Sequence, residues 1–216
     1  MKAVLIEFHQ AFADRDYDKV VKCGEGIDIA DIHQSDERRR VIHRLAIAYQ
    51  EIGASNNSLD LYRRLVRDYP DFQAGWEFFA QFFEKQKDYE SALAHWEEVA
   101  DKFPKSTLAY WSIGNIYKNN LKDYDKAIEM YQKQIERFPE RQSGYQGVAE
   151  SLQDATRYNE ALTAWNLVKK KFPKEPKSYW AIGHIYKDLQ QFEKAESYFK
   201  LLIENFPQRE RILEFG

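Results

Sequence analysis

A proline that recurs about every 34 residues constrains this chain more than any other feature. Five prolines each follow a tyrosine or phenylalanine, and their spacings are 34, 35, 34 and 34 residues. They are Pro70, Pro104, Pro139, Pro173 and Pro207. A fixed period of this length is typical of chains that stack one supersecondary unit on the next, so we expect a repeat architecture.

Each repeat holds two sets of apolar residues at helical spacing. Six residues after the proline comes an aromatic ring, here called the first ring, then a small residue four positions on and a large apolar residue three beyond it. A ring, an alanine and a second ring follow further along. Spacings of three and four keep side chains on one helix face, so each repeat is expected to be two helices. In one repeat these residues are Tyr110, Gly114, Tyr117, Tyr124, Ala127 and Tyr131.

Two nonapeptides, YWSIGNIYK at 110–118 and YWAIGHIYK at 179–187, carry the pattern most clearly. Together with the later alanine, ring and proline, they resemble the tetratricopeptide repeat. This resemblance extends from Phe72 to Pro207 and implies an all-α, right-handed superhelical α-solenoid of helix-turn-helix repeats. The matching positions are Tyr110, Ile113, Gly114, Tyr117, Ala127, Tyr131, Pro139, Tyr179, Ile182, Gly183, Tyr186, Ala195, Phe199 and Pro207.

The repeat divides 1–216 into a single expected solenoid of about six repeats. Asp88, Asp123 and Ser106 are expected to cap helices. We expect a longer turn at 53–57, and the extra residue of the 35-residue repeat in the turn at 121–123. The expected ranges are 1–35 (a degenerate cap), 39–72, 73–106, 107–141, 142–175 and 176–209, with a short tail at 210–216.

The resemblance also implies a concave groove lined by first helices. Its lining would be the first, fifth and eighth residues after each first ring, which we call the groove positions. They are Glu77, Gln81, Glu84, Trp111, Asn115, Lys118, Gln146, Glu150, Gln153, Trp180, His184 and Lys187.

Two groove positions hold tryptophan, which packing does not require there. Trp111 and Trp180 would be large, stiff contacts for a partner, or would cover a neighbouring helix. Asn115 and Gln146 could bond the backbone of an extended peptide. The family's clamp on a C-terminal carboxylate is not expected, because Glu150 would repel the ligand.

The sequence offers no catalytic, cofactor or metal motif. Its five histidines lack metal-ligand spacing, and there is no glycine-rich phosphate loop. Glu150 and His184 could approach across adjacent repeats, but a hydrogen bond or ion pair is the expected relation. We therefore predict a chain that is not an enzyme and needs no cofactor.

Charge and composition narrow the partners. A formal charge of −3 gives no basic face for nucleic acid, which also disfavours the RNA-processing half-repeat relatives of the family. The single cysteine, the lack of a signal peptide and the lack of an apolar run long enough for a membrane span favour the cytoplasm.

The leading prediction is a non-catalytic scaffold or adaptor that binds a peptide segment or partner protein in the groove. The alternative is a non-catalytic arm of a larger enzyme or assembly, such as a bacterial glycosyltransferase, that positions a partner or substrate chain. Only QRERILEFG follows Pro207, so the last helix pair is expected to be incompletely covered. Self-association through the C-terminal repeat is therefore a further possibility.

Overall fold

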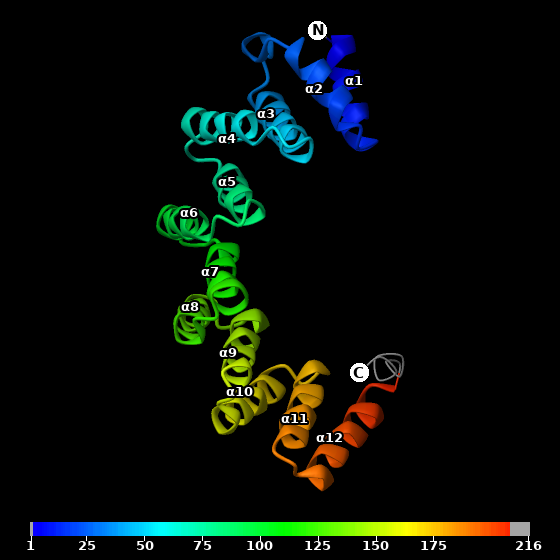
Figure 1. Ribbon diagram of the computed structural model, residues 1–216, viewed down its shortest axis with the longest axis vertical. Helices are drawn as coiled ribbons and strands as arrows, with labels where there is room; N and C mark the ends of the chain where they lie inside the picture. Colours follow the sequence, from blue (N-terminus) through cyan, green and yellow to red (C-terminus); the bar gives the residue numbers. More distant parts are fainter. Residues whose placement is uncertain (1, 208–216) are drawn as a thin grey trace. The chain divides into compact units, whose positions relative to one another are not determined.

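The computed structural model describes residues 2–207, which form paired helices and contain no strand (Figure 1). The all-α fold is thereby confirmed. The expected tail at 210–216 lies outside the described residues. The helices are α1 Lys2–Ala13, α2 Tyr17–Glu25, η1 Ile29–Asp31, α3 Ser35–Glu51, α4 Ser55–Asp68, α5 Gln73–Lys85, α6 Tyr89–Lys102, α7 Thr107–Asn115, η2 Ile116–Leu121, α8 Tyr124–Arg137, α9 Gln142–Asp154, α10 Tyr158–Lys171, α11 Lys177–Asp188 and α12 Phe192–Asn205.

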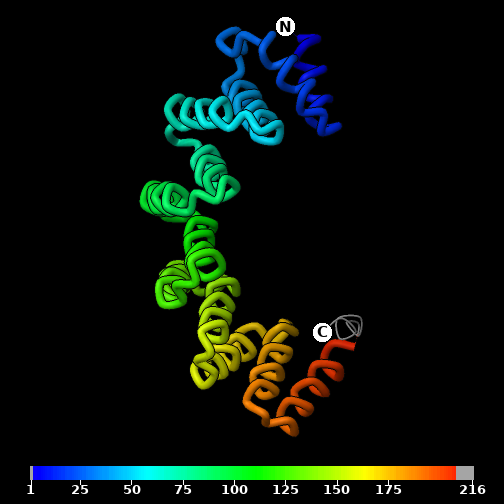
Figure 2. The backbone as a smooth tube through the Cα atoms, viewed as in Figure 1, coloured from blue at the N-terminus to red at the C-terminus, as the bar shows by residue number. Residues whose placement is uncertain are grey.

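The helices divide into two compact units, Met1–Pro104 and Lys105–Gly216. We call them the N-terminal and C-terminal units. Each contains three helix pairs, which Figure 2 traces as successive hairpins. The two helices of each pair are joined by a tight turn. The helix α3 begins at Ser35, four residues before the expected range 39–72.

In the later pairs, a ring from the second helix lies on a small residue of the first, whereas α2 has Gly24 where that ring would stand. Trp96, Tyr131 and Trp165 are almost completely buried in this way. A β-carbon added at Gly114 would stand 2.5 Å from Cε1 of Tyr131, and one at Gly183 would stand 2.6 Å from Cε1 of Phe199. The small residue is therefore needed because the ring sits directly on the helix backbone.

The turns inside the six described pairs share one geometry. In each, the residue two positions before the second helix has a positive φ between 57° and 82°. These residues are Arg15, Gly53, Lys87, Lys122, Thr156 and Gln190. The expected longer turn at 53–57 is wrong, because α4 already begins at Ser55.

The extra residue of the 35-residue repeat also lies elsewhere than expected. The turn at Lys122 is like the others, and the residue is absorbed in the π-helix η2. A π-turn accommodates one more residue while the backbone groups stay hydrogen-bonded, whereas a longer turn would expose them.

The expected caps are confirmed. The side chains of Asp88 and Asp123 accept backbone N–H bonds of 3.1 Å at the starts of α6 and α8. Ser106 accepts a bond of 3.3 Å from the backbone of Ala109 at the start of α7. Each cap satisfies a backbone donor that the helix leaves unpaired.

Candidate protein-interaction surfaces

The first helices of the C-terminal unit carry nine of the groove positions. In Figure 1, α7 and α9 lie in sequence along this unit, with α8 to the left of α7 and α10 below α9. Trp111 on α7 is half-buried, and its ring centroid lies 5.5 Å from that of Tyr131. Trp180 on α11 is 36% exposed, and the ring of His184 lies 4.1 Å away. Of the two tryptophans, Trp180 is the more open to a partner.

Asn115 is already hydrogen-bonded within its own repeat. Its Oδ1 atom accepts a bond of 2.8 Å from the hydroxyl of Tyr131. His184 occupies the same position in the last repeat, where its ring contacts Phe199 at 5.3 Å. The two nonapeptides thus differ at the position that faces the second-helix ring. Asn115 stands where that ring is Tyr131 and carries a hydroxyl, and His184 stands where it is Phe199.

Glu150 on α9 connects three successive first helices. It accepts hydrogen bonds from Lys118 on η2 and, at 2.5 Å, from Lys177 on α11. Burial acts to raise the pKa of Glu150, but the bonds and charges of the two lysines outweigh it and leave the pKa below its usual value. The partners of Glu150 are these lysines rather than His184.

In two repeats, the groove position eight residues after the first ring accepts a hydrogen bond from the second-helix ring. The Oε1 atom of Gln153 accepts a 3.0 Å bond from the indole N–H of Trp165, and Glu84 accepts the corresponding bond from Trp96. The burial of Glu84 raises the pKa of its carboxyl despite that bond. The sequence shows this relation. The position holds a hydrogen-bond acceptor in the repeats whose second-helix ring is tryptophan, and a lysine in the repeats where that ring is Tyr131 or Phe199.

The remaining groove positions lie at the surface. Gln146 is half-buried on α9, and Lys187 is exposed on α11. In the N-terminal unit, Gln81 is half-buried, and Glu77 accepts a 2.8 Å bond from Gln73.

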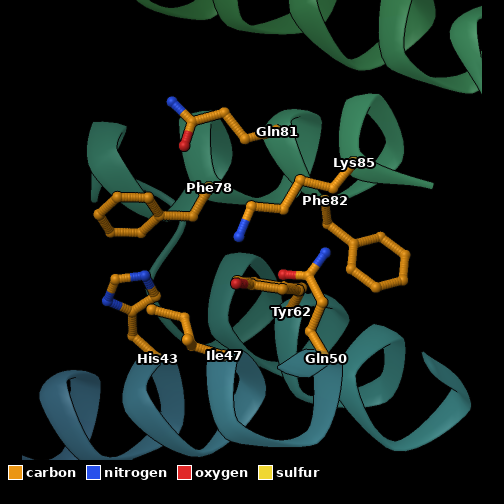
Figure 3. A pocket seen from close by; sticks show the side chains of 8 residues that line it. All are labelled: His43, Ile47, Gln50, Tyr62, Phe78, Gln81, Phe82 and Lys85. Carbon is orange, nitrogen blue, oxygen red and sulfur yellow. The ribbon is translucent and has the colours of Figure 1, made fainter. Parts of the chain in front are cut away.

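The N-terminal unit contains a partly open pocket of about 140 Å³ between α3 and α5 (Figure 3). Sequence reasoning missed it. His43, Ile47 and Gln50 are the first, fifth and eighth residues after Ile42, which takes the first-ring position of its repeat. The groove rule, applied to that repeat, would have named them. The full lining is His43, Ile47, Gln50, Tyr62, Phe78, Gln81, Phe82 and Lys85.

The pocket has aromatic walls, and one of its lining residues carries a buried polar atom without a partner. The rings of His43 and Phe78 stack with centroids 3.7 Å apart. Burial lowers the pKa of His43 to about 4, so its ring is neutral near pH 7. The Nε2 atom of Gln50 is buried without a hydrogen-bond partner among the described residues. Lys85 forms an ion pair of 3.3 Å with Glu51 at the edge of the pocket.

Family models of the tetratricopeptide repeat match residues 43–106, 108–141 and 176–209, which is more than half of the chain. The chain belongs to the tetratricopeptide repeat family. Residues 142–175, between the matched segments, hold a tetratricopeptide-like pair formed by α9 and α10. No curated protein matches the sequence.

Solved structures of tetratricopeptide repeat proteins share the fold. The C-terminal part of such a protein from Cytophaga hutchinsonii has a TM-score of 0.71 and 16% identity, over 94% of this chain and 80% of that one. MamA from Desulfovibrio magneticus RS-1 has a TM-score of 0.62 and 13% identity, over 80% of this chain and 97% of that one. YrrB, described as having an unusual peptide-binding site, has a TM-score of 0.57 and 14% identity, over 84% of this chain and 93% of that one.

Tetratricopeptide repeats are typical of protein-interaction scaffolds. Residues 2–207 contain no group of three or more side chains arranged to hold a metal ion. Within the same range, no helix combines the length and the apolar character needed to cross a membrane.

Proposed function

We propose that this tetratricopeptide chain is a non-catalytic scaffold that binds a segment of a partner protein on the first helices of the C-terminal unit. The observation that carries the proposal is the exposed indole of Trp180, held beside His184. A stiff ring that is already positioned loses little entropy on binding and is a frequent source of interface energy.

The neighbouring groove positions support an extended segment as the ligand. Gln146 and Trp111 stand one and two repeats before Trp180 at the same position, so one segment could contact all three in turn. YrrB, which shares the fold, has a peptide-binding site according to its description. We further propose that the three first helices form a concave groove and that the protein works in the cytoplasm.

Selection of binders from a random linear-peptide library would test the proposal. Selected peptides should bind the Trp180→Ala variant at least about tenfold more weakly than the unaltered chain. Leu167→Ala is the matched control, since Leu167 is 44% exposed but lies on the second helix α10. Peptides that bind all three proteins equally would refute the proposed surface.

A second candidate is an arm of a larger assembly, such as a bacterial glycosyltransferase, or a self-associating repeat. It is favoured by α12, where Phe192 is 61% exposed and Leu201 and Ile203 are each about two-fifths exposed. Sedimentation velocity tests self-association directly. Association should rise with concentration and be reduced by Leu201→Glu, whereas a monomer at every concentration would count against it.

A further inference from the structure

The two groove tryptophans differ in what their indole rings contact. On α7, the ring of Trp111 pairs with Tyr131, the second-helix ring of its repeat, with centroids 5.5 Å apart and planes tilted by 48°. On α11, the ring of Trp180 pairs at 4.1 Å with His184 rather than with Phe199, the residue that corresponds to Tyr131. The same position therefore holds its tryptophan in two different settings.

The imidazole of His184 contacts both the indole of its repeat and the second-helix ring. It lies edge-on to Phe199, with centroids 5.3 Å apart, and it contacts Trp180 four residues back on the same helix face. In the other nonapeptide, Asn115 has no ring, and its amide oxygen is bonded to the hydroxyl of Tyr131 at 2.8 Å. The last repeat thus has one more ring between its two helices than the earlier repeat.

The surroundings of His184 suit an uncharged ring. Its side chain is half-buried on α11. Burial lowers the pKa of His184 below its usual value, and the charge of Lys187 lowers it further, whereas Asp188 acts in the opposite direction. The imidazole is therefore neutral near pH 7 and packs as an aromatic ring.

We propose that His184 is a positioning residue that holds the indole of Trp180 away from Phe199 and so keeps it open to a partner. Trp180 is 36% exposed, whereas Trp111, which has no such spacer, is half-buried. The residue five positions after the first ring, together with the second-helix ring, then decides whether a groove tryptophan is exposed or packs within its repeat. The consequence for a partner rests on the proposed function above, whereas the position of the indole does not.

Exchange of these residues between the two repeats tests the proposal. The double variant His184→Asn, Phe199→Tyr gives the last repeat the combination found around Trp111. NMR relaxation enhancement by a soluble gadolinium chelate measures how exposed the ring protons of each tryptophan are. For Trp180, the enhancement should fall to the level that Trp111 has in the unaltered chain.

The reciprocal double variant, Asn115→His with Tyr131→Phe, should raise the enhancement at Trp111. It also separates the effect of the spacer from the place of the repeat in the chain, because Trp180 lies in the last described helix pair and Trp111 does not. Unchanged enhancement at both tryptophans would overturn the proposal, since exposure would then depend on the place of the repeat.

Two single variants distinguish a spacer from a contact that merely stabilises the repeat. His184→Phe keeps a ring at this position and should preserve the enhancement of Trp180. His184→Ala removes the ring and should lower the enhancement. Loss in both variants would show that something other than a ring holds the indole, contrary to the proposal.

Peptide binding separates this proposal from the proposed function. The probes are peptides selected on the unaltered chain from a random linear library. If the open setting of Trp180 falls to about one tenth of the molecules in the double variant, these peptides should bind it about tenfold more weakly. Lower enhancement with unchanged affinity would support the positioning role of His184 and refute Trp180 as the binding contact. Weaker binding with unchanged enhancement would overturn the positioning role.

Discussion

The first helices of the two compact units carry polar side chains at matching positions, and these side chains differ in whether they have a hydrogen-bond partner within the chain. In the C-terminal unit, Asn115 and Gln153 accept bonds from Tyr131 and Trp165, and Glu150 accepts bonds from two lysines. In the N-terminal unit, Glu84 likewise accepts a bond from Trp96, but Gln50, which also lines a pocket, has a buried Nε2 donor without a partner among the described residues. A groove position is therefore structural or available for binding according to the ring that faces it.

This comparison predicts its largest effect at Glu150. Replacement by Leu should lower the free energy of unfolding by about 3 kcal/mol, because Lys118, whose side chain is only 9% exposed, would lose its counter-charge. Urea unfolding followed by circular dichroism measures the loss.

The control is Glu160→Leu, which removes the exposed pair between Glu160 and Arg157 on α10. That change should cost far less, because both groups of this pair are exposed to solvent. Equal losses in the two variants would mean that Lys118 reaches water when Glu150 is absent, and that the network contributes little to stability.

The fold was largely predictable because its determinants are local and repeated. The ring, small and alanine positions recur in phase, so packing could be inferred from Tyr110, Gly114 and Tyr131 without coordinates. The π-helix could not be inferred, because a 35-residue repeat does not say where its extra residue lies. The turn at Lys122 has the same geometry as the other turns, so the extra residue lies in the π-helix before it.

A second prediction concerns the protonation of His43. Its pKa in the folded chain is about 4, below its value near 6.5 in the unfolded chain, so the unfolded chain binds the extra proton first. The stabilisation from keeping His43 neutral is complete above pH 6.5 and is lost as the pH falls toward 4. It amounts to about 3 kcal/mol.

Comparison with His43→Phe isolates this contribution, because phenylalanine preserves the stack on Phe78 but does not titrate. Unfolding free energies measured from pH 7 to pH 4 should fall less steeply in the variant. Parallel curves would show that His43 is accessible to protons in the folded chain and that the pocket wall is more open than the structure indicates.

A third prediction contrasts two glutamines at the same groove position. Gln153→Leu leaves the indole N–H of the buried Trp165 without an acceptor and should cost about 1–3 kcal/mol. Gln50→Leu removes a donor that is already unpaired and should be neutral or stabilising by up to about 1 kcal/mol. A similar loss in both variants, measured by thermal unfolding, would contradict the distinction between the two units.

The site residues were less predictable than the fold, and these glutamines show why. The groove rule identifies which residues a first helix turns toward one face, but it does not consider the opposing ring. Gln153 accepts a bond from an indole N–H, whereas Gln50 lines a pocket together with Tyr62, although both occupy the same position. Reading each groove position together with its second-helix ring would have separated them.

The smallest expected effect comes from removing one hydroxyl oxygen, that of Tyr131 in the C-terminal unit or that of Tyr62 in the N-terminal unit. Tyr131→Phe removes the 2.8 Å bond to Asn115, leaves the amide oxygen unpaired in a half-buried place, and should cost about 1 kcal/mol. In the repeat of Tyr62 the position equivalent to Asn115 holds Ile47, which cannot accept a hydrogen bond, so Tyr62→Phe should change stability by less than about 0.5 kcal/mol. Thermal unfolding of the two variants gives the difference directly. If Tyr62→Phe proves as costly as Tyr131→Phe, the hydroxyl of Tyr62 has a strong hydrogen-bond partner of its own, contrary to the comparison.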